Sequence, residues 1–333
     1  MAQIVLGIGS SHGPMLTMPP STWHERVKAD RGNPDLFYKG KALPFEEIAQ
    51  RRKGERLERQ ITPEIMAERH AACQKALDRL AAVFAEVKPD VAVLFGNDQM
   101  EMFSDLIPAF SVYWGESLPN KMYSAERMAK MPPGIAISVP GHIPPQGAVY
   151  KGLPALGKHI LERTIAEQFD VASMTKMPGG HETLPHAFGF IYRRIMSDQP
   201  VPSVPVVLNT FYPPNQPTVR RCYEFGKSVV KAIQSWESNA RVALIASGGL
   251  THWVIDEEVD QTVIDAMRNR RIEKVAALGE ETFQAGTSEI KNWIPVAGAM
   301  ADLGFEMNLV DYVPCYRSEA GTGNAMGFVY WRP

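Results

Sequence analysis

The sequence predicts an α/β fold with a central, mostly parallel or mixed sheet, helices on both faces and long loop insertions. Short apolar runs of strand length alternate along the chain with longer segments of helical period, which is typical of this class. Four of the apolar runs end in a small-residue turn that carries polar groups. The 333 residues, 45% of them hydrophobic, are enough for a large core, and we expect a single catalytic domain over residues 1–333.

The individual elements follow from apolar spacing and from capping residues. Uninterrupted apolar runs predict strands at residues 4–8, 91–95, 204–208, 242–246, 307–313 and 326–331. Helices are predicted at residues 62–87, 152–169, 218–236, 257–284 and 289–303. The first of these has the clearest signals, because Thr62 can cap it, Pro63 suits its first turn and its apolar residues recur at three- and four-residue steps.

Two segments interrupt this alternation. Residues 16–60 are polar and rich in Arg, Lys, Pro and Gly, and residues 115–150 are irregular and rich in proline. Insertions of this length are usually functional, so we expect them to shape a pocket, to act as a lid or to contact another subunit.

Composition excludes several classes of protein. A net charge of −2 argues against a basic surface that binds nucleic acid. The sequence contains no run of eighteen apolar residues, the length needed to span a membrane. The N-terminus lacks the pattern of a secretory signal, and the three cysteines are odd in number and far apart, so we expect a reducing cytoplasm. Phosphate-binding glycine motifs, a GxSxG elbow and CxxC pairs are all missing.

The polar turns that follow four of the strands predict a functional site. They carry Ser11-His12, Asp98-Gln99, Asn209-Thr210 and Thr251-His252. Ligands of open α/β sheets bind at the carboxyl ends of the strands, so these side chains are expected at one edge. His12 can be a metal ligand or a turn residue, and His252 can be a general base, a ligand or a helix cap.

Other candidates have two readings each. His181 and His186 lie in the segment GGHETLPHAFGF, and their spacing of five does not place them on one helix face. An active-site loop and a solvated loop therefore both fit. Glu289 can be an N-terminal helix carboxylate or the anionic ligand of a two-histidine, one-carboxylate iron site. His70 lies on an apolar helix stripe and is expected to be a core histidine.

Seven segments, taken in order, resemble the class III extradiol ring-cleavage dioxygenases of the protocatechuate 4,5-dioxygenase catalytic-subunit type, with gallate and 3-O-methylgallate dioxygenases as relatives. They are GIGSSHGPM, PDVAVLFGNDQ, GGHETLPHAFGF, NTFYPPNQPTVRRCYEFG, ASGGLTHW, GTSEIKNW and GTGNAMGFVYW. The resemblance extends over most of the chain. It implies a non-haem Fe(II) enzyme that cleaves a catechol-, gallate- or hydroxypyridone-like aromatic with O2.

The resemblance also implies a set of metal ligands. His12 matches the first histidine ligand of the family and Glu289 the carboxylate, whereas Gln99 stands where the second histidine belongs. An amide oxygen is a weaker donor to Fe(II) than an imidazole nitrogen. Gln99 can bind directly or through water, the metal can be lost, or another residue can supply the ligand, the candidates being His181, Asp98 and His70.

The remaining roles also come from the resemblance. His252 and His181 match the two active-site histidines of the family, and His252 is expected to act as base and acid. Tyr212 and Asn324 are expected beside the substrate. A homodimer or larger homo-oligomer is expected. The alternatives are a metal-dependent lyase or hydrolase on the same scaffold, and a non-catalytic protein that binds a metal or a redox partner.

Overall fold

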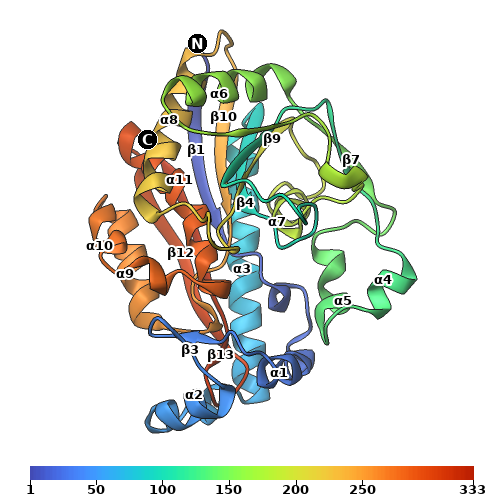
Figure 1. Cartoon of the computed structure of the whole chain (residues 1–333), viewed down its shortest axis with the longest axis vertical. Coiled ribbons are helices and arrows are strands. Elements are labelled where there is room, and N and C mark those ends of the chain that lie inside the picture. The colour runs from blue at the N-terminus through green and yellow to red at the C-terminus, as the bar shows by residue number, and fades with distance from the viewer.

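The computed structural model describes residues 1–333 and is built around a nine-stranded mixed sheet (Figure 1). The parallel centre of the sheet contains β1 (Gln3–Ser10), β10 (Arg241–Ser247), β4 (Val91–Asn97) and β9 (Ser203–Leu208). Antiparallel pairing adds β13 (Thr322–Arg332) beside β1, and β13 in turn pairs with β12 (Glu306–Tyr316) and β11 (His252–Val254). The opposite edge consists of β5 (Phe110–Tyr113) and β8 (Ala172–Met174). The predicted α/β class is confirmed.

Helices complete the fold. The longer ones are α3 (Pro63–Val87), α6 (Pro154–Ala166), α8 (Val219–Ser235), α9 (Glu257–Arg268) and α11 (Ile290–Leu303). The side chains of Thr62, Thr218 and Asp256 cap α3, α8 and α9 by accepting a backbone N–H three residues later. The single helix predicted over residues 257–284 is instead α9 followed by α10 (Ile272–Ala276), because Arg270 between them has a left-handed backbone. None of the helices has the length and apolar character required to cross a bilayer.

Both faces of the sheet are covered. Alternate residues of β4 point to opposite sides, so Val93 packs in one core and Leu94 in the other. The first core includes Phe225 of α8 and Trp293 of α11, whereas the second includes Leu77 of α3. The strands are therefore fixed from both sides, and only the loops at their ends are free to form a site.

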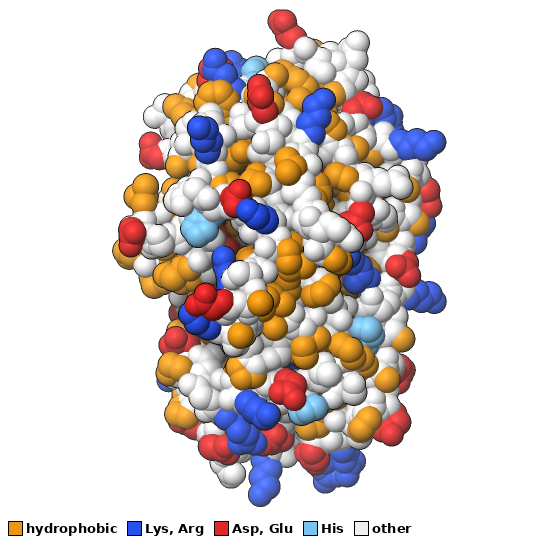
Figure 2. Space-filling view, turned by 90° about the vertical axis from the view of Figure 1, so that its right-hand side faces the viewer, with side chains coloured by type: hydrophobic (Ala, Val, Ile, Leu, Met, Phe, Trp, Pro, Cys, Tyr) orange, Lys and Arg blue, Asp and Glu red, His pale blue; other side chains and the backbone are white.

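The two insertions fold into short elements rather than long irregular loops. Residues 16–60 contain α1 (His24–Arg31), α2 (Phe45–Arg52), β2 (Phe37–Tyr38) and β3 (Lys41–Ala42). Residues 115–150 contain β6 (Ser117–Asn120), α4 (Ala125–Ala129), α5 (Ile135–Ser138) and β7 (Ala148–Lys151). Figure 2 views the side formed by α4, α5 and β7, where hydrophobic side chains reach the surface among charged ones. Val149 of β7 is among the exposed large hydrophobic residues of the chain.

Candidate metal centre and substrate cavity

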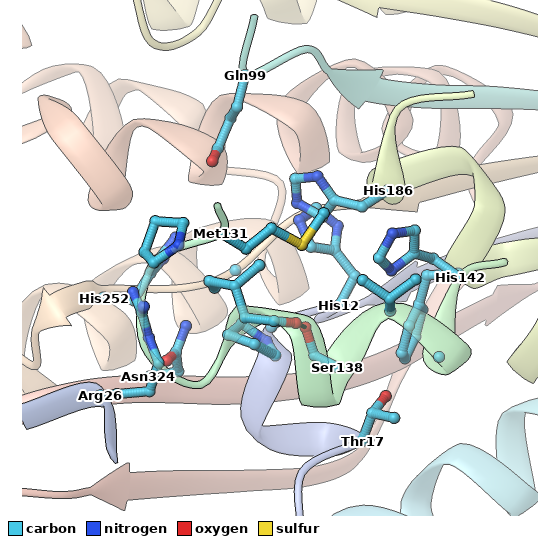
Figure 3. A pocket seen from close by; sticks show the side chains of 18 of the residues that line it. His12, Thr17, Arg26, Gln99, Met131, Ser138, His142, His186, His252 and Asn324 are labelled. Carbon is cyan, nitrogen blue, oxygen red and sulfur yellow. Dashed lines mark hydrogen bonds between the residues drawn. The ribbon is translucent and has the colours of Figure 1, made fainter. Parts of the chain in front are cut away.

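Four of the predicted site residues meet at the carboxyl edge of the parallel strands. His12 comes two residues after β1, and Gln99 comes two residues after β4. His252 begins β11, and Glu289 ends the 3-10 turn Ala285–Glu289 that leads into α11. All four line one cavity of about 410 Å³ (Figure 3). The expectation that strand ends would gather these side chains is met by this geometry.

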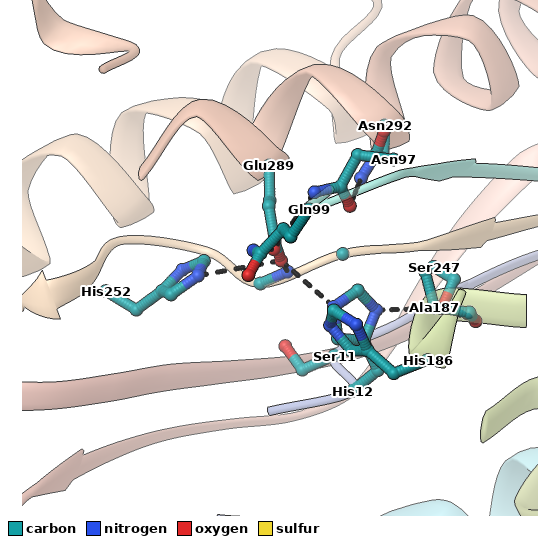
Figure 4. A network of polar contacts seen from close by, with 12 residues as sticks. Ser11, His12, Asn97, Gln99, His186, Ala187, Ser247, His252, Glu289 and Asn292 are labelled. Atoms are coloured by element: carbon teal, nitrogen blue, oxygen red, sulfur yellow. Dashed lines mark hydrogen bonds and ion pairs between the residues drawn. The ribbon is translucent and has the colours of Figure 1, made fainter. Parts of the chain in front are cut away.

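The Glu289 carboxylate lies at the centre of this group and is fully buried (Figure 4). Its Oε1 accepts hydrogen bonds from Gln99 Nε2 at 2.7 Å and from Asn97 Nδ2 at 3.3 Å, and its Oε2 accepts one from the Gly249 N–H at 2.9 Å. Burial alone would raise the pKa of Glu289, but positive charge beside it, on His12 and His252 when they are protonated, outweighs burial and holds the pKa well below its ordinary value. The carboxylate is therefore ionised in the interior.

The neighbours of His12 fix its tautomer. The Ser247 hydroxyl donates its only hydrogen to the Ala187 carbonyl at 2.6 Å, so it must accept the bond that joins it to His12 Nδ1 at 2.9 Å. The proton of neutral His12 is thus on Nδ1, and the lone pair of Nε2 faces Glu289 Oε2 at 3.2 Å. Burial lowers the pKa of His12 more than Glu289 raises it, so the imidazole is neutral.

Two acceptors consequently face each other inside the protein. His12 Nε2 is buried and has no hydrogen-bond partner, and an anionic oxygen lies 3.2 Å away. Buried polar atoms are normally satisfied, so this pair requires a proton or a metal cation between its members. A neutral imidazole nitrogen and a carboxylate oxygen are the donors that a divalent transition metal takes, and the arrangement fits a metal ion.

His186 contributes a third donor atom to the same point. One nitrogen of His12, one of His186 and one oxygen of Glu289 all lie within 4.8 Å of one another. His186 is the first residue of α7 (His186–Phe190), and its Nδ1 lies 2.8 Å from Glu101 Oε2, while its backbone N–H donates to Glu101 Oε1. Burial would lower the pKa of His186, but the Glu101 carboxylate outweighs it and raises the pKa to about 9. Carboxylates that hold a histidine in this way recur beside metal ligands.

The orientation of His252 differs from that of His186. Its Nδ1 lies 2.8 Å from the Leu250 carbonyl, an obligate acceptor, so Nδ1 carries the proton and Nε2 presents a lone pair to the cavity. That Nε2 is 3.6 Å from Glu289 Oε2. Gly249 allows the ring this position, because a Cβ there would come within 2.5 Å of His252 Nδ1. Trp253 follows with a left-handed φ of 65°, a strained backbone for a bulky residue at the cavity wall.

Of the other residues predicted for the site, only Asn324 lines this cavity. His181 does not line the cavity, Asp98 accepts three backbone N–H groups of its own turn, and His70 lies beside Gln74 on α3. Tyr212 is outside the wall, and burial raises its pKa to about 12.

Sequence reasoning considered His186 only with His181 and missed Glu101 altogether. Glu101 stands two residues after Gln99, so a search for carboxylates near the end of the strand could have found it.

The insertions supply much of the cavity wall. Residues 16–60 contribute Thr17 and Arg26, and nine lining residues come from residues 123–142, among them Tyr123, Met131 and His142. Farther along the chain, Arg317 lines the wall and pairs with Asp30 of α1 through two bonds of 2.7 Å, both side chains being buried. The pair ties the first insertion to the loop between β12 and β13.

We expect Asp30→Ala to lower the free energy of unfolding by about 3–5 kcal/mol, because it leaves the Arg317 guanidinium buried without a counter-charge. The Thr322 hydroxyl loses its acceptor as well, because it donates to the Asp30 carboxylate. Urea unfolding followed by tryptophan fluorescence measures the loss. The exposed Asp35, changed to Ala, is the control and should alter stability by less than about 0.5 kcal/mol. Equal stability of the two variants would contradict the expectation.

Two comparisons bear on these residues. The family model described as "Catalytic LigB subunit of aromatic ring-opening dioxygenase" matches residues 63–322. The gallate dioxygenase of Pseudomonas putida is 28% identical over 176 residues, which cover 49% of this chain and 48% of that enzyme. The match thus spans about half the length of the curated relative. Because the family model covers most of the chain, including His186, His252 and Glu289, the protein belongs to the family of catalytic LigB subunits of aromatic ring-opening dioxygenases.

Proposed function

We propose that the protein is an extradiol dioxygenase that holds Fe(II) with His12, His186 and Glu289 and opens the ring of a catechol- or gallate-like aromatic. The observation that carries the proposal is the pair of opposed acceptors, His12 Nε2 and Glu289 Oε2, buried 3.2 Å apart at the edge of the sheet. The family of the chain and the nearby His186 nitrogen support it. Fe(II), when bound, would supply a Lewis acid that makes a catechol oxygen easier to ionise and a route for electrons to O2.

In this proposal Gln99 positions Glu289 and does not replace the missing histidine. Its amide nitrogen donates to Glu289 Oε1 at 2.7 Å, and Asn97, itself held by Asn292, donates to the same oxygen. These two amides leave Oε2 as the carboxylate oxygen that faces both His12 and His252. The proposal assigns no role to His181, Asp98 or His70.

His252 is the proton carrier in this mechanism. Its Nδ1–H is held by the Leu250 carbonyl, so the free Nε2 accepts a proton from a substrate hydroxyl at the cavity edge. The imidazolium that forms lies near the anionic Glu289, which stabilises it. The protonated Nε2 can then return the proton to a substrate oxygen that gains negative charge later in the reaction. Tyr123, Met131 and Ile135 line the same cavity, and with a substrate bound their apolar surface would reduce the access of water to the reacting groups.

Oxygen uptake by anaerobically iron-loaded protein tests the proposal. The panel should contain catechols, gallates and hydroxypyridones, with bound iron quantified for each preparation. We expect uptake and a ring-opened product with at least one of them, both oxygen atoms coming from O2. Absence of uptake with every compound, despite bound iron, would contradict the proposal. Anaerobic turnover would indicate a lyase or hydrolase instead.

We expect Glu101→Gln to weaken Fe(II) binding by about 10–100-fold, because the His186 ring loses the carboxylate that orients it. Competition with a chelator measures the affinity without reference to activity. The control is Glu182→Gln, whose carboxylate is 63% exposed and pairs with a lysine. If both variants bind iron as the wild type does, His186 is not held for the metal by Glu101.

A further inference from the structure

Arg26 is a charged side chain of the cavity wall with few partners. It projects from α1, and its Nη1 donates to the Pro133 carbonyl at 2.8 Å. Its Nε is buried and has no hydrogen-bond partner, and no carboxylate lies within ion-pair distance of the guanidinium. A guanidinium has five N–H groups, so most of those of Arg26 have no partner within the protein.

The nearest acidic group is already committed. Asp30 Oδ1 accepts from Arg317 Nη2, and Asp30 Oδ2 accepts from Arg317 Nε and from the Thr322 hydroxyl. Arg317 also donates to Asn324 Oδ1 at 3.1 Å. The carboxylate nearest to both guanidinium groups is therefore bonded to Arg317 and leaves Arg26 without an ion-pair partner.

The other charges of the cavity do not offset Arg26. Glu101 lies against His186, and Glu289 belongs to the candidate metal centre. Arg127 adds a further positive charge and stacks on the Tyr123 ring, 4.0 Å from its centre. Burial, together with the charge of Arg317, lowers the pKa of Arg26 to about 10. A cation that is partly withdrawn from water and unpaired stabilises an anion placed beside it.

The geometry of the wall indicates where such an anion would lie. Figure 3 shows Arg26 on the same side of the cavity as His252 and Asn324, away from His142. Met131, Ile135 and Phe190 supply apolar surface for a ring elsewhere in the same wall. A cavity of about 410 Å³ suits a single substituted ring.

We propose that Arg26 binds the carboxylate of the aromatic substrate and makes an anionic substituent the main determinant of specificity. This inference rests on the proposed function, since it supposes that the hydroxyl groups of the ring lie toward the candidate metal centre of His12, His186 and Glu289. It gives α1, and thus the first insertion, a direct part in choosing the substrate.

Anaerobic calorimetric titration with 3,4-dihydroxybenzoate and with its methyl ester tests the inference in the iron-loaded protein. The variants are R26M and R26K, and the matched control is K28M, which removes an exposed positive charge from the same helix. We expect the wild type and K28M to bind the carboxylate about 10–100-fold more tightly than the ester, as for a charge-assisted hydrogen bond. In R26M the affinities for the acid and for the ester should differ by no more than about twofold, and the affinity for the ester should equal that of the wild type. R26K should show an intermediate preference for the acid.

The outcomes separate this inference from the proposed function. A wild type that binds acid and ester equally, or a folded R26M that keeps the full preference, overturns the inference even if oxygen uptake is normal. Should R26M fail to fold, the two wild-type titrations and R26K still decide the result. A preference that depends on Arg26 supports the inference even where no compound supports oxygen uptake, because binding is measured without O2.

Discussion

Replacement of Glu289 by Gln is expected to abolish binding of Fe(II), with a loss of affinity greater than about 100-fold. Removing a residue that only supports a metal ligand costs up to about 100-fold, and the loss of a ligand should cost more. The substitution keeps the size of the side chain and removes the charge that neutralises the ion. It also brings an amide NH2 to a position where Gln99, Asn97 and the Gly249 N–H already donate. The new side chain can satisfy only part of that set.

Thermal stability measures this loss independently of activity. A ligand present at 100 times its dissociation constant stabilises the folded state by about 2.7 kcal/mol, so Fe(II) should raise the melting temperature of the wild type. We expect no such increase for E289Q. The control is Glu281→Gln, an exposed carboxylate eight residues earlier, which should respond to iron as the wild type does. An iron-dependent increase in E289Q equal to that of the wild type would contradict the metal assignment.

The parts of the fold that could be predicted from sequence are those whose signal is local. β1, β4, β9 and β10 are runs of apolar residues buried on both faces, and α3 has its own cap and stripe. The short strands β5, β8 and β11 could not be predicted in this way. β11 has three residues, His252–Val254, and becomes a strand only because it pairs with residues 322–324 of β13.

The same distinction holds for the candidate site. His12 and Gln99 come two residues after a strand and His252 comes five residues after β10, so their meeting at one edge was predictable once those strands were recognised. The choice between His181 and His186 was not, because it depends on where α7 begins and on a contact with Glu101, 85 residues away in sequence. Arg26 was hidden for a similar reason, since only folding of the first insertion brings it into the cavity.

Replacement of His252 by Gln is expected to reduce turnover by about 10²–10⁴-fold, the usual contribution of a positioned general base. Metal affinity should change by only a few-fold, because the proposed ligands are His12, His186 and Glu289 and each keeps its own hydrogen-bond partner. The substrate should still bind, but its hydroxyl should remain protonated, which the ultraviolet spectrum of the anaerobic complex reports. His24→Gln removes an imidazole that is 66% exposed and is the matched control. Turnover that survives in H252Q but is lost in H181Q would contradict this geometry, because His181 does not line the cavity. Loss of both iron and turnover in H252Q would instead indicate that His252 is a metal ligand. This alternative is the one most worth testing, because His252 Nε2 lies 3.6 Å from Glu289 Oε2.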